Sequence, residues 1–348
     1  RKIQPMKIFV VGAGAIGGLL AFRLAAAGHD VSVVARGAHR DAIAARGLTL
    51  VDHQKDRTDT QTMPASAEPS DFGLQDVVFI GLKAHAIPAM LPRIAPLLGQ
   101  QTLVVPAING VPWWYFQRER GEHDGLVVTR VDPQGDMASV IAAEAIIGCV
   151  VHAAAEVREP GVVHHTKGNG FIFGEIDRGL ADPVTPRLQR LAAAIDEAGL
   201  EATMSKDIRH DVWAKLIGNL SFNPVAALTF ADMARLCASE GLLEVIRPLL
   251  KEGMAVARGY GVHITMTPDQ RIDVARRLGA ARISMHQDFE AHRKPEIEAI
   301  VGALIELAGH VDVPVPVTRM IYALVRERAL SDGLLDPPAR CGAGFLPR

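Results

Sequence analysis

The chain has 348 residues, of which 49% are hydrophobic and 22% charged, and its formal net charge is −2. This length exceeds what one hydrophobic core usually holds, so we expect a globular protein of about two domains. The nearly balanced charge provides no global field for nucleic acid or an anionic membrane, and neither is predicted as a partner.

Cysteine usage and hydropathy bear on the compartment. The three cysteines, Cys149, Cys237 and Cys341, lie far apart and have no metal-ligand spacing. A sparse, odd set of cysteines does not suggest a disulfide framework, so we expect a reducing cytoplasm and no bound metal. The longest apolar tract is interrupted by Glu144 and His152, and no segment has the pattern of a membrane span.

The first part of the chain alternates strands and helices. Residues 7–11, KIFVV, form a short β-rich run that ends in glycines, and residues 15–28 show helical periodicity closed by Gly28. Residues 30–36, DVSVVAR, supply the next strand. This β-α-β unit predicts a parallel sheet covered by helices.

Later strands of the same sheet are predicted at residues 76–85 and 102–110. Ligands of doubly wound sheets bind beyond the carboxyl ends of the strands, so Lys83 and Asn109 lie at the edge of the sheet where a ligand is expected. Residues 146–175 then alternate short β-rich runs with Gly/Pro turns, which indicates antiparallel strands appended to the sheet.

The sequence pattern changes near residue 185 from alternating strands and helices to helices. We predict a Rossmann-type α/β domain with a doubly wound, mostly parallel sheet over residues 6–185, and an all-α domain over residues 186–330. Residues 331–348 are rich in Pro and Gly and are expected to form a loosely ordered tail. The helical patterns of the second half cover residues 185–199, 208–223, 240–261, 268–293, 295–309 and 316–330.

A glycine-rich turn joins the first strand to the first helix. Its G-x-G-x-x-G spacing allows a tight turn, close approach of the backbone to a pyrophosphate, and packing of the helix against the strand. An ordinary sharp turn is the alternative, but the strand before it, the helix after it and the second strand all fit a dinucleotide site. The predicted cofactor-binding residues of the turn are Gly12, Ala13, Gly14, Ala15, Ile16 and Gly17.

The end of the second strand indicates which dinucleotide is bound. NAD sites usually place an acid there for the ribose hydroxyl, whereas this strand ends in Arg36 without Asp or Glu. A guanidinium can hold a 2′-phosphate, so NADP (as NADPH) is the expected cofactor. Alternatively, Arg36 is a solvated loop arginine.

One lysine and two asparagines interrupt a mostly apolar helical segment, VWAKLIGNLSFNPVAAL (residues 212–228). Because four residues advance a helix by slightly more than one turn, Lys215, Asn219 and Asn223 point in similar directions. They form either a solvent-facing stripe or a row that faces a substrate. Pro224 should end or bend the helix at this point.

Several segments together resemble the ketopantoate reductase family (2-dehydropantoate 2-reductase). They are the glycine turn, GLKAHAI, AING, residues 212–228 and SMHQDFEAHRKPEIE (residues 284–298), and the resemblance runs from about residue 6 to 328. It implies NADPH-dependent reduction of 2-dehydropantoate to (R)-pantoate, a step towards pantothenate and coenzyme A. It also implies a Rossmann-type N-terminal domain, a helical C-terminal domain and an active-site cleft between them.

The same resemblance implies roles for individual residues. In the family a lysine is catalytic, an acid contacts the substrate hydroxyl, and asparagines and a serine hold the substrate. The matching residues are Lys215 and Glu296 as catalytic residues, Asn219, Asn223, Ser284 and Asn109 as substrate-binding residues, and Lys83 and Asn109 as cofactor-binding residues.

Elementary chemistry is consistent with these roles. Hydride transfer to a keto carbon builds negative charge on the carbonyl oxygen, which a positioned ammonium can stabilise and protonate. Burial would lower the pKa of Lys215, while a nearby Glu296 would oppose that shift. Pro295 fits the first turn of a new helix, where Glu296 would meet the positive helix end, with stabilisation of that end as its alternative role.

Some positions depart from the family pattern and leave the substrate open. Pro295 and Ala226 stand where a threonine is common, and Glu298 replaces an aspartate. Another branched 2-oxo acid, a substrate of the β-hydroxyacid dehydrogenase type, and a non-catalytic NADPH-binding regulatory protein are the alternatives. The joint presence of the catalytic groups favours an enzyme, and the apolar C-terminal helices leave room for a homodimer.

Two further clusters receive no assignment. Trp113, Trp114, Tyr115 and Phe116 are aromatic enough to line a pocket or to fill a domain or subunit contact. The histidines of the β-rich region lack metal-ligand spacing and are expected to be surface or satisfied histidines; they are His152, His164 and His165.

Overall fold

The structure is a computed structural model that describes residues 4–336, and these residues form two compact units. The first unit ends at Lys215 and the second begins at Leu216. The division therefore falls inside one long helix, α6 (Ile208–Thr229).

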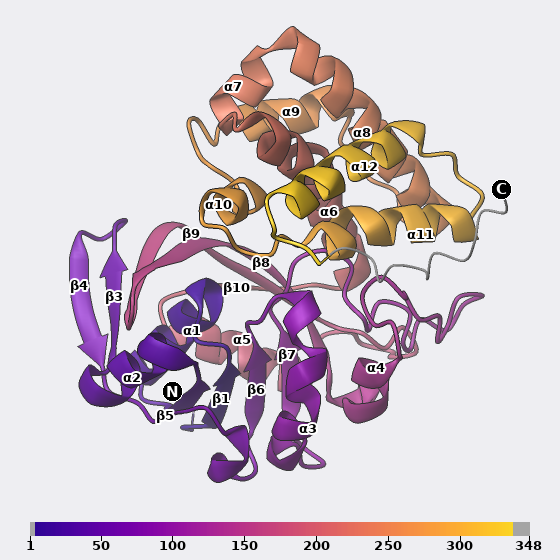
Figure 1. Cartoon of the computed structure of the whole chain (residues 1–348). Coiled ribbons are helices and arrows are strands. Elements are labelled where there is room, and N and C mark those ends of the chain that lie inside the picture. The colour runs from indigo at the N-terminus through magenta and orange to yellow at the C-terminus, as the bar shows by residue number, and fades with distance from the viewer. Residues whose placement is uncertain (1–3, 337–348) are drawn as a thin grey trace, which may run out of the picture. The chain divides into compact units, whose positions relative to one another are not determined.

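A five-stranded parallel sheet forms the base of the first unit (Figure 1). Its strand order is β5-β2-β1-β6-β7, so the chain starts in the middle, runs to one edge and crosses to the other, as in nucleotide-binding doubly wound sheets. Apolar residues fill both faces of the central strands, which explains their near-continuous hydrophobic sequences. The strands are β1 (Lys7–Val11), β2 (Asp30–Val34), β5 (Ala65–Ser66), β6 (Val77–Ile80) and β7 (Leu103–Pro106).

A second sheet is built around one long strand, β9 (Val162–Glu175). It pairs with β8 antiparallel, and with β3 and β10 in parallel. The short antiparallel runs predicted at residues 146–175 are thus two long strands, joined to the parallel sheet by a single bridge between Val104 and Ile146. The other strands are β3 (Leu48–Asp52), β4 (Arg57–Gln61), β8 (Ile147–Glu159) and β10 (Glu201–Met204).

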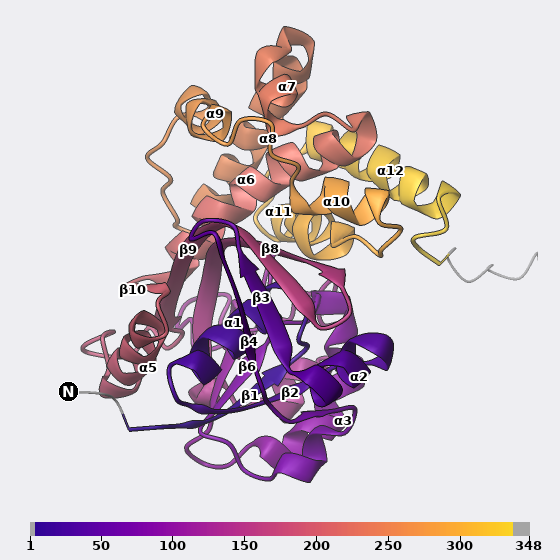
Figure 2. The same ribbon diagram turned by 90° about the vertical axis from the view of Figure 1, so that its left-hand side faces the viewer.

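Helix α1 (Ala15–Ala26) contacts strands of both sheets of the first unit (Figure 2). Its residues from Gly17 to Phe22 are buried, and Arg23 pairs with Asp52 at the end of β3. Helix α5 (Pro186–Glu197) packs on β9 and β10 of the first unit. The first unit therefore extends beyond residue 185, where the sequence changes to helical patterns.

The remaining helices of the first unit are short. They follow the strands of the parallel sheet and the long loop after β7. They are α2 (Gly37–Arg46), α3 (Leu91–Ile94) and α4 (Asp136–Val140), with 3₁₀ turns at Pro69–Phe72, Ala84–Ala86, Pro88–Met90, Ala95–Leu97 and Ala143–Ala145.

The second unit is helical, and α8 contacts most of its other helices. Leu220 and Ile217 of α6 approach α8 at Gly253, where a side chain would crowd them. Glu252 of α8 accepts hydrogen bonds from the first backbone N–H groups of α12. Beyond α6 the helices are α7 (Met233–Ala238), α8 (Glu240–Gly259), α9 (Pro268–Arg276), α10 (Ser284–Glu290), a π-helical turn (Glu298–Gly302), α11 (Ala303–His310) and α12 (Pro316–Ser331).

Two expectations about these helices need correction. The pattern over residues 268–293 is not one helix but two, α9 and α10, separated by an irregular segment. Helix α6 does not end at Pro224 but continues to Thr229. The proline removes one backbone donor, and burial of Phe222 and Val225 on either side compensates for that loss.

Most of the tail predicted at residues 331–348 lies outside the described residues, which end at residue 336. Within residues 4–336, every helix is too short or too polar to cross a bilayer.

Candidate functional site

The glycine turn has the geometry of a dinucleotide cradle. Gly12 has a φ of 94°, which favours glycine, and a Cβ at Gly17 would overlap the carbonyl oxygen of Gly12, so the start of α1 packs tightly on the turn. A Cβ at Gly14 would meet no atom within 4 Å. Open space above Gly14, at the N-terminus of α1, is where a pyrophosphate can approach the backbone.

A pocket extends from this turn to the end of β2 and is lined in part by Gly12, Gly14, Arg36 and His39. Arg36 is exposed, and its guanidinium lies 3.9 Å from the sulfur of Met90, which also lines the pocket. The described residues of the lining include no carboxylate. The pocket can therefore accept an additional negative charge beside Arg36.

His39 supports the turn and was not singled out from the sequence. Its Nδ1 accepts a hydrogen bond from the N–H of Gly161 at 2.9 Å, so its Nε2 carries the proton that it donates to the carbonyl of Ala13 at 2.7 Å. The neutral imidazole thus ties the glycine turn to the β8–β9 turn. A single histidine without a spacing pattern gives no sequence signal for this role.

Lys215 and Asn109 meet, although 106 positions separate them. The Lys215 ammonium donates to Asn109 Oδ1 at 2.7 Å and to the carbonyl of Val151 on β8 at 2.6 Å. Asn109 follows β7, at the carboxyl edge of the parallel sheet. Lys83 follows β6 at the same edge.

The Lys215 ammonium also acts on a neighbouring thiol. Burial raises the pKa of Cys149 to about 12, and the positive charge of Lys215 opposes that shift. Cys149 is therefore an inert buried thiol at neutral pH. Cys149 lies on β8, two residues before Val151, whose carbonyl accepts a hydrogen bond from Lys215. Both residues are buried, so an apolar part of β8 lies beside the lysine.

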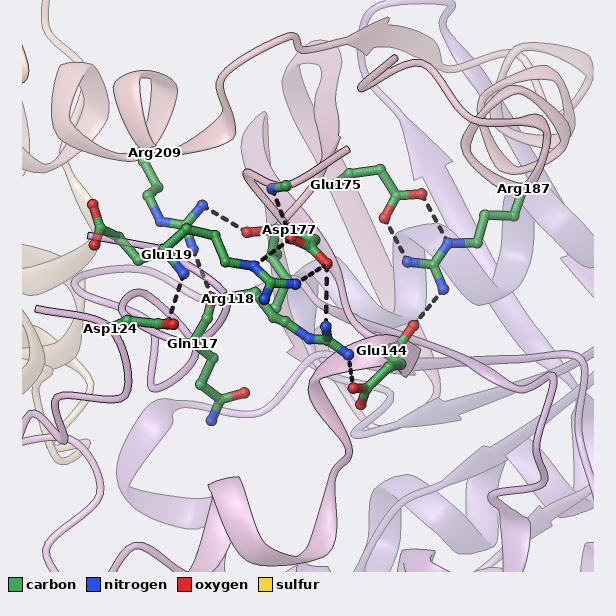
Figure 3. A network of polar contacts seen from close by, with 12 residues as sticks. Gln117, Arg118, Glu119, Asp124, Glu144, Glu175, Asp177, Arg187 and Arg209 are labelled. Atoms are coloured by element: carbon green, nitrogen blue, oxygen red, sulfur yellow. Dashed lines mark hydrogen bonds and ion pairs between the residues drawn. The ribbon is translucent and has the colours of Figure 1, made fainter. Parts of the chain in front are cut away.

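The first turns of α6 are fixed to the first unit by a buried arginine (Figure 3). The Arg209 guanidinium, 1% exposed, donates to three backbone carbonyls: Tyr115 at 2.7 Å, and Gln117 and Ile176 at 2.8 Å each. Burial lowers the pKa of Arg209 to about 10, so it keeps its charge at neutral pH. Because Lys215 lies six residues later on the same helix, this clamp helps to fix its position.

The aromatic cluster left unassigned from the sequence belongs to this clamp. All four residues from Trp113 to Phe116 are buried. The Arg209 guanidinium lies over the rings of Trp114 and Tyr115, 5.9 and 5.8 Å from their centroids. Trp213 donates from its indole N–H to the Tyr115 hydroxyl. These aromatics are core, and they hold α6.

The other predicted residues lie in the second unit. Asn219 is half-buried, and Asn223 is only 2% exposed, yet its Nδ2 has no hydrogen-bond partner among the described residues. Ser284 is the exposed first residue of α10. Glu296 is 8% exposed and immediately precedes the helix that begins at Ile297, so Pro295 lies just before the first turn and not within it.

Two family models match the chain. The model described as "Ketopantoate reductase PanE/ApbA" matches residues 8–178, and "Ketopantoate reductase PanE/ApbA C terminal" matches residues 207–329. A 2-dehydropantoate 2-reductase of Mesorhizobium japonicum is 43% identical over 329 residues, which are 94% of this chain and 99% of that protein. The chain belongs to the ketopantoate reductase family. It is an oxidoreductase that uses a pyridine nucleotide.

Solved structures agree with this membership in the ketopantoate reductase family. One from Ralstonia solanacearum is 37% identical, with a TM-score of 0.90 over 95% of this chain and all of that one. A D-mandelate dehydrogenase complex with NADH and anilino(oxo)acetate has a TM-score of 0.81 and is 20% identical over 94% of this chain, which shows a common fold alone. The family and the two-part fold predicted from the sequence motifs are thereby confirmed.

For a ketopantoate reductase family member, the geometry of the first unit suits hydride chemistry. The N–H groups of Gly12 and Ala13 donate to the Val34 carbonyl, and the open space above Gly14, at the N-terminus of α1, is where a dinucleotide can approach. The ammonium of Lys215 contacts Asn109 at the sheet edge where such ligands bind. The open space above Gly14, which a side chain there would fill, fits the cofactor of the family.

Proposed function

We propose that the chain reduces 2-dehydropantoate to (R)-pantoate with NADPH, with Lys215 as general acid, on the route to pantothenate and coenzyme A. The observation that supports this most directly is the hydrogen bond between Lys215 and Asn109. It brings the family's catalytic lysine to the loop after β7. The name and the 43% identity of the Mesorhizobium relative support the substrate.

The cofactor proposal depends on the glycine turn and Arg36. NADPH, when bound, supplies the hydride. Gly12, Gly14 and Gly17 would receive its pyrophosphate, and Arg36 would pair with the 2′-phosphate, since the lining described for this pocket has no acid to favour a free ribose hydroxyl. Lys83 and Asn109 would contact the cofactor from the ends of β6 and β7.

Lys215 would stabilise and then protonate the oxygen of the substrate ketone. Asn109 Oδ1 and the Val151 carbonyl accept hydrogen bonds from the ammonium and fix its direction. As negative charge develops on the ketone oxygen, the ammonium donates a proton and becomes an amine, which regains a proton from water. Such a positioned acid contributes roughly 10²–10⁴ in rate.

The substrate would lie along the polar side of α6. Asn219 and Asn223 can each donate and accept, so they can fix a small polar molecule without adding charge. The unmet Nδ2 of Asn223, buried at 2% exposure, supports a ligand there. Ser284 would contact the carboxylate and Glu296 the hydroxyl group of the substrate.

One observation favours a second candidate, a different branched 2-oxo acid. Ala226 is completely buried where the family usually has a threonine, so the hydroxyl at that position is lost. Glu298, which replaces an aspartate, is engaged by the Tyr322 hydroxyl at 2.8 Å and is accounted for by packing within the second unit. The change at 226, three residues from Asn223 on α6, would alter which 2-oxo acid fits beside that asparagine.

An NADPH oxidation assay with 2-dehydropantoate and a panel of branched and unbranched 2-oxo acids tests the proposal. We expect the highest kcat/KM for 2-dehydropantoate. A higher value for another acid would support the second candidate. Tight NADPH binding without turnover of any acid would instead identify a non-catalytic NADPH-binding protein.

A further inference from the structure

Arg271 of α9 lies against α6 at a glycine. A Cβ at Gly218 would overlap Nη2 of Arg271 and would lie 3.2 Å from both its Cζ and its Nε. The guanidinium thus occupies the space that a side chain at position 218 would fill. Gly218 is three residues after Lys215 and next to Asn219, and residues three apart on a helix are surface neighbours.

The Arg271 guanidinium has no partner among residues 4–336. No carboxylate, carbonyl or hydroxyl within that range accepts a hydrogen bond from it, although the residue is only partly exposed. Burial lowers the pKa of Arg271, with no opposing effect from a nearby acid. A partly desolvated cation without an anion is costly, and other arginines of residues 4–336, such as Arg93, Arg120 and Arg187, are paired with carboxylates.

A second unmet group lies on the same helix. Nδ2 of Asn223 is buried without a hydrogen-bond partner among the described residues, and the side chain of Asn219 makes no hydrogen bond within residues 4–336. Unsatisfied buried donors are uncommon in folded proteins. One buried unmet donor on α6, with a partly desolvated arginine against the same helix, indicates that a polar, anionic molecule binds there.

We propose that Arg271 binds the carboxylate of the 2-oxo acid substrate on α6, one helical turn beyond Lys215, together with the Ser284 contact proposed above. This inference rests on the proposed function. The planar guanidinium matches a carboxylate with two parallel hydrogen bonds, which Asn219 and Asn223 cannot replace. Gly218 lies three residues after Lys215 on α6, so a carboxylate held there is within one helical turn of the lysine, and the keto carbon is one bond, about 1.5 Å, from the carboxylate carbon.

The inference assigns a role to Gly218 as well. Any side chain there must displace the flexible end of Arg271, because that end is the nearest group to the added Cβ. The variant Gly218→Ala therefore moves the guanidinium without removing its charge, and alanine is a better helix former than glycine. It provides a second test that does not depend on deleting an arginine.

The decisive experiment compares a 2-oxo acid with its uncharged methyl ester in the NADPH oxidation assay. We expect Arg271→Met to raise KM for the acid about 30- to 100-fold, with a much smaller change in kcat and no change in the Kd of NADPH. The preference for acid over ester should shrink by the same factor, because the ester loses nothing. Arg271→Lys should recover part of the preference, and Gly218→Ala should shift KM in the same direction as Arg271→Met.

The matched control is Arg277→Met, which removes an exposed arginine six residues further along. Equal KM values for Arg271→Met and Arg277→Met, or an unchanged acid-to-ester ratio in Arg271→Met, would overturn the inference. If Arg271→Met does not fold, Gly218→Ala gives the same comparison.

Failure of the proposed function gives a different result. If the wild-type protein reduces no 2-oxo acid, titration calorimetry with oxamate, an unreactive 2-oxo acid analogue, in the presence of NADPH still tests Arg271. Weaker oxamate binding in Arg271→Met by at least tenfold would support an anion site even so. Equal binding in both proteins would reject it.

Discussion

At the scale of single residues, the ammonium of Lys215 is held by a side-chain oxygen and a backbone carbonyl. Both are neutral acceptors that orient the ammonium. We expect Lys215→Ala to lower kcat by about 10²–10⁴ and to leave the Kd of NADPH nearly unchanged, because the glycine turn is not altered. Stopped-flow or steady-state NADPH oxidation measures the first, and fluorescence titration the second.

The matched control for this lysine is Lys206→Ala. Lys206 is exposed and lies just before α6, so its removal should leave kcat within about twofold of wild type. A Lys215→Ala protein with wild-type kcat would exclude the general-acid role, whatever its effect on stability.

Arg36 is the residue that should distinguish the two cofactors. Loss of charge-assisted hydrogen bonds to a phosphate costs about 1.5–3 kcal/mol, so Arg36→Ala should weaken NADPH binding by roughly 10- to 100-fold. NADH has no 2′-phosphate and should bind almost as before. Titration of both dinucleotides into both proteins measures the ratio, with Arg46→Ala, an exposed arginine at the end of α2, as the control. Equal weakening of NADH and NADPH would contradict the phosphate assignment.

At the scale of elements, α6 carries most of the proposed chemistry, and Arg209 fixes its beginning. We expect Arg209→Met to lower the free energy of unfolding by about 3 kcal/mol, because three backbone carbonyls, two of them in buried hydrogen bonds, lose the charged donor that Arg209 provides. Release of the buried charge offsets part of this cost but cannot supply the missing donors. Urea unfolding measures the loss.

The same variant should also move the helix relative to Asn109, so kcat should fall even where the protein is fully folded. Arg120→Met is the control, since that arginine is largely exposed and pairs with Asp177 at 2.9 Å. Removal of this exposed ion pair should leave the free energy of unfolding nearly unchanged. Equal stability losses in the two variants would show that Arg209 is not a clamp.

Periodicity predicted the elements whose burial is uniform. The strands β1, β2, β6 and β7 and the long helices α1, α6 and α8 follow from apolar runs and from 3.6-residue spacing. Strand β4, RTDTQ, is polar and partly exposed, so its sequence contains no comparable signal and only pairing with β3 makes it a strand. Pro224 predicted an earlier end for α6 than the structure shows, because tertiary packing outweighs the local cost of a proline.

The candidate site could be predicted only in part for a similar reason. Glycine spacing and the lysine–asparagine row are local patterns, and family resemblance supplied the roles. The partners of Lys215 come from β8 and from the loop after β7, over long sequence separations that no local pattern encodes. Arg271 and His39 are single polar residues, whose surroundings become visible only when the chain is folded.

At the scale of the whole molecule, the first unit encloses titratable groups that affect its stability in acid. Burial lowers the pKa of His29 and of His165 below the ordinary value of 6.5. Nδ1 of His29 accepts a hydrogen bond from the N–H of Met6 at 3.2 Å, a bond that protonation would break. His165 is fully buried, with Nε2 against the carbonyl of Gly168 at 2.5 Å.

A neighbouring carboxylate titrates in a different range. Burial would raise the pKa of Asp52, but hydrogen bonds from the Arg23 side chain and the Gln54 backbone N–H bring it below its usual value. Its contribution to stability is therefore present above the ordinary aspartate pKa, about 3.9, and is lost only below that pH. Asp52 therefore does not change the free energy of unfolding between neutral pH and pH 5.

The fold favours the neutral form of His29 and His165, whereas the unfolded chain protonates both near pH 6.5. Their contribution is complete above that pH and is lost as the pH falls through it towards the lower pKa values of the folded state, so the free energy of unfolding should fall between about pH 7.5 and about 5.5. His29→Asn keeps an acceptor for Met6, and His165→Gln keeps a donor for Gly168, but neither replacement titrates. Urea unfolding at the two pH values should therefore show a smaller pH dependence in the double variant than in wild type, while His310→Gln, at an exposed position, should keep the full dependence. If the double variant lost as much stability on acidification as the wild type, the loss would have to come from groups outside these two buried sites.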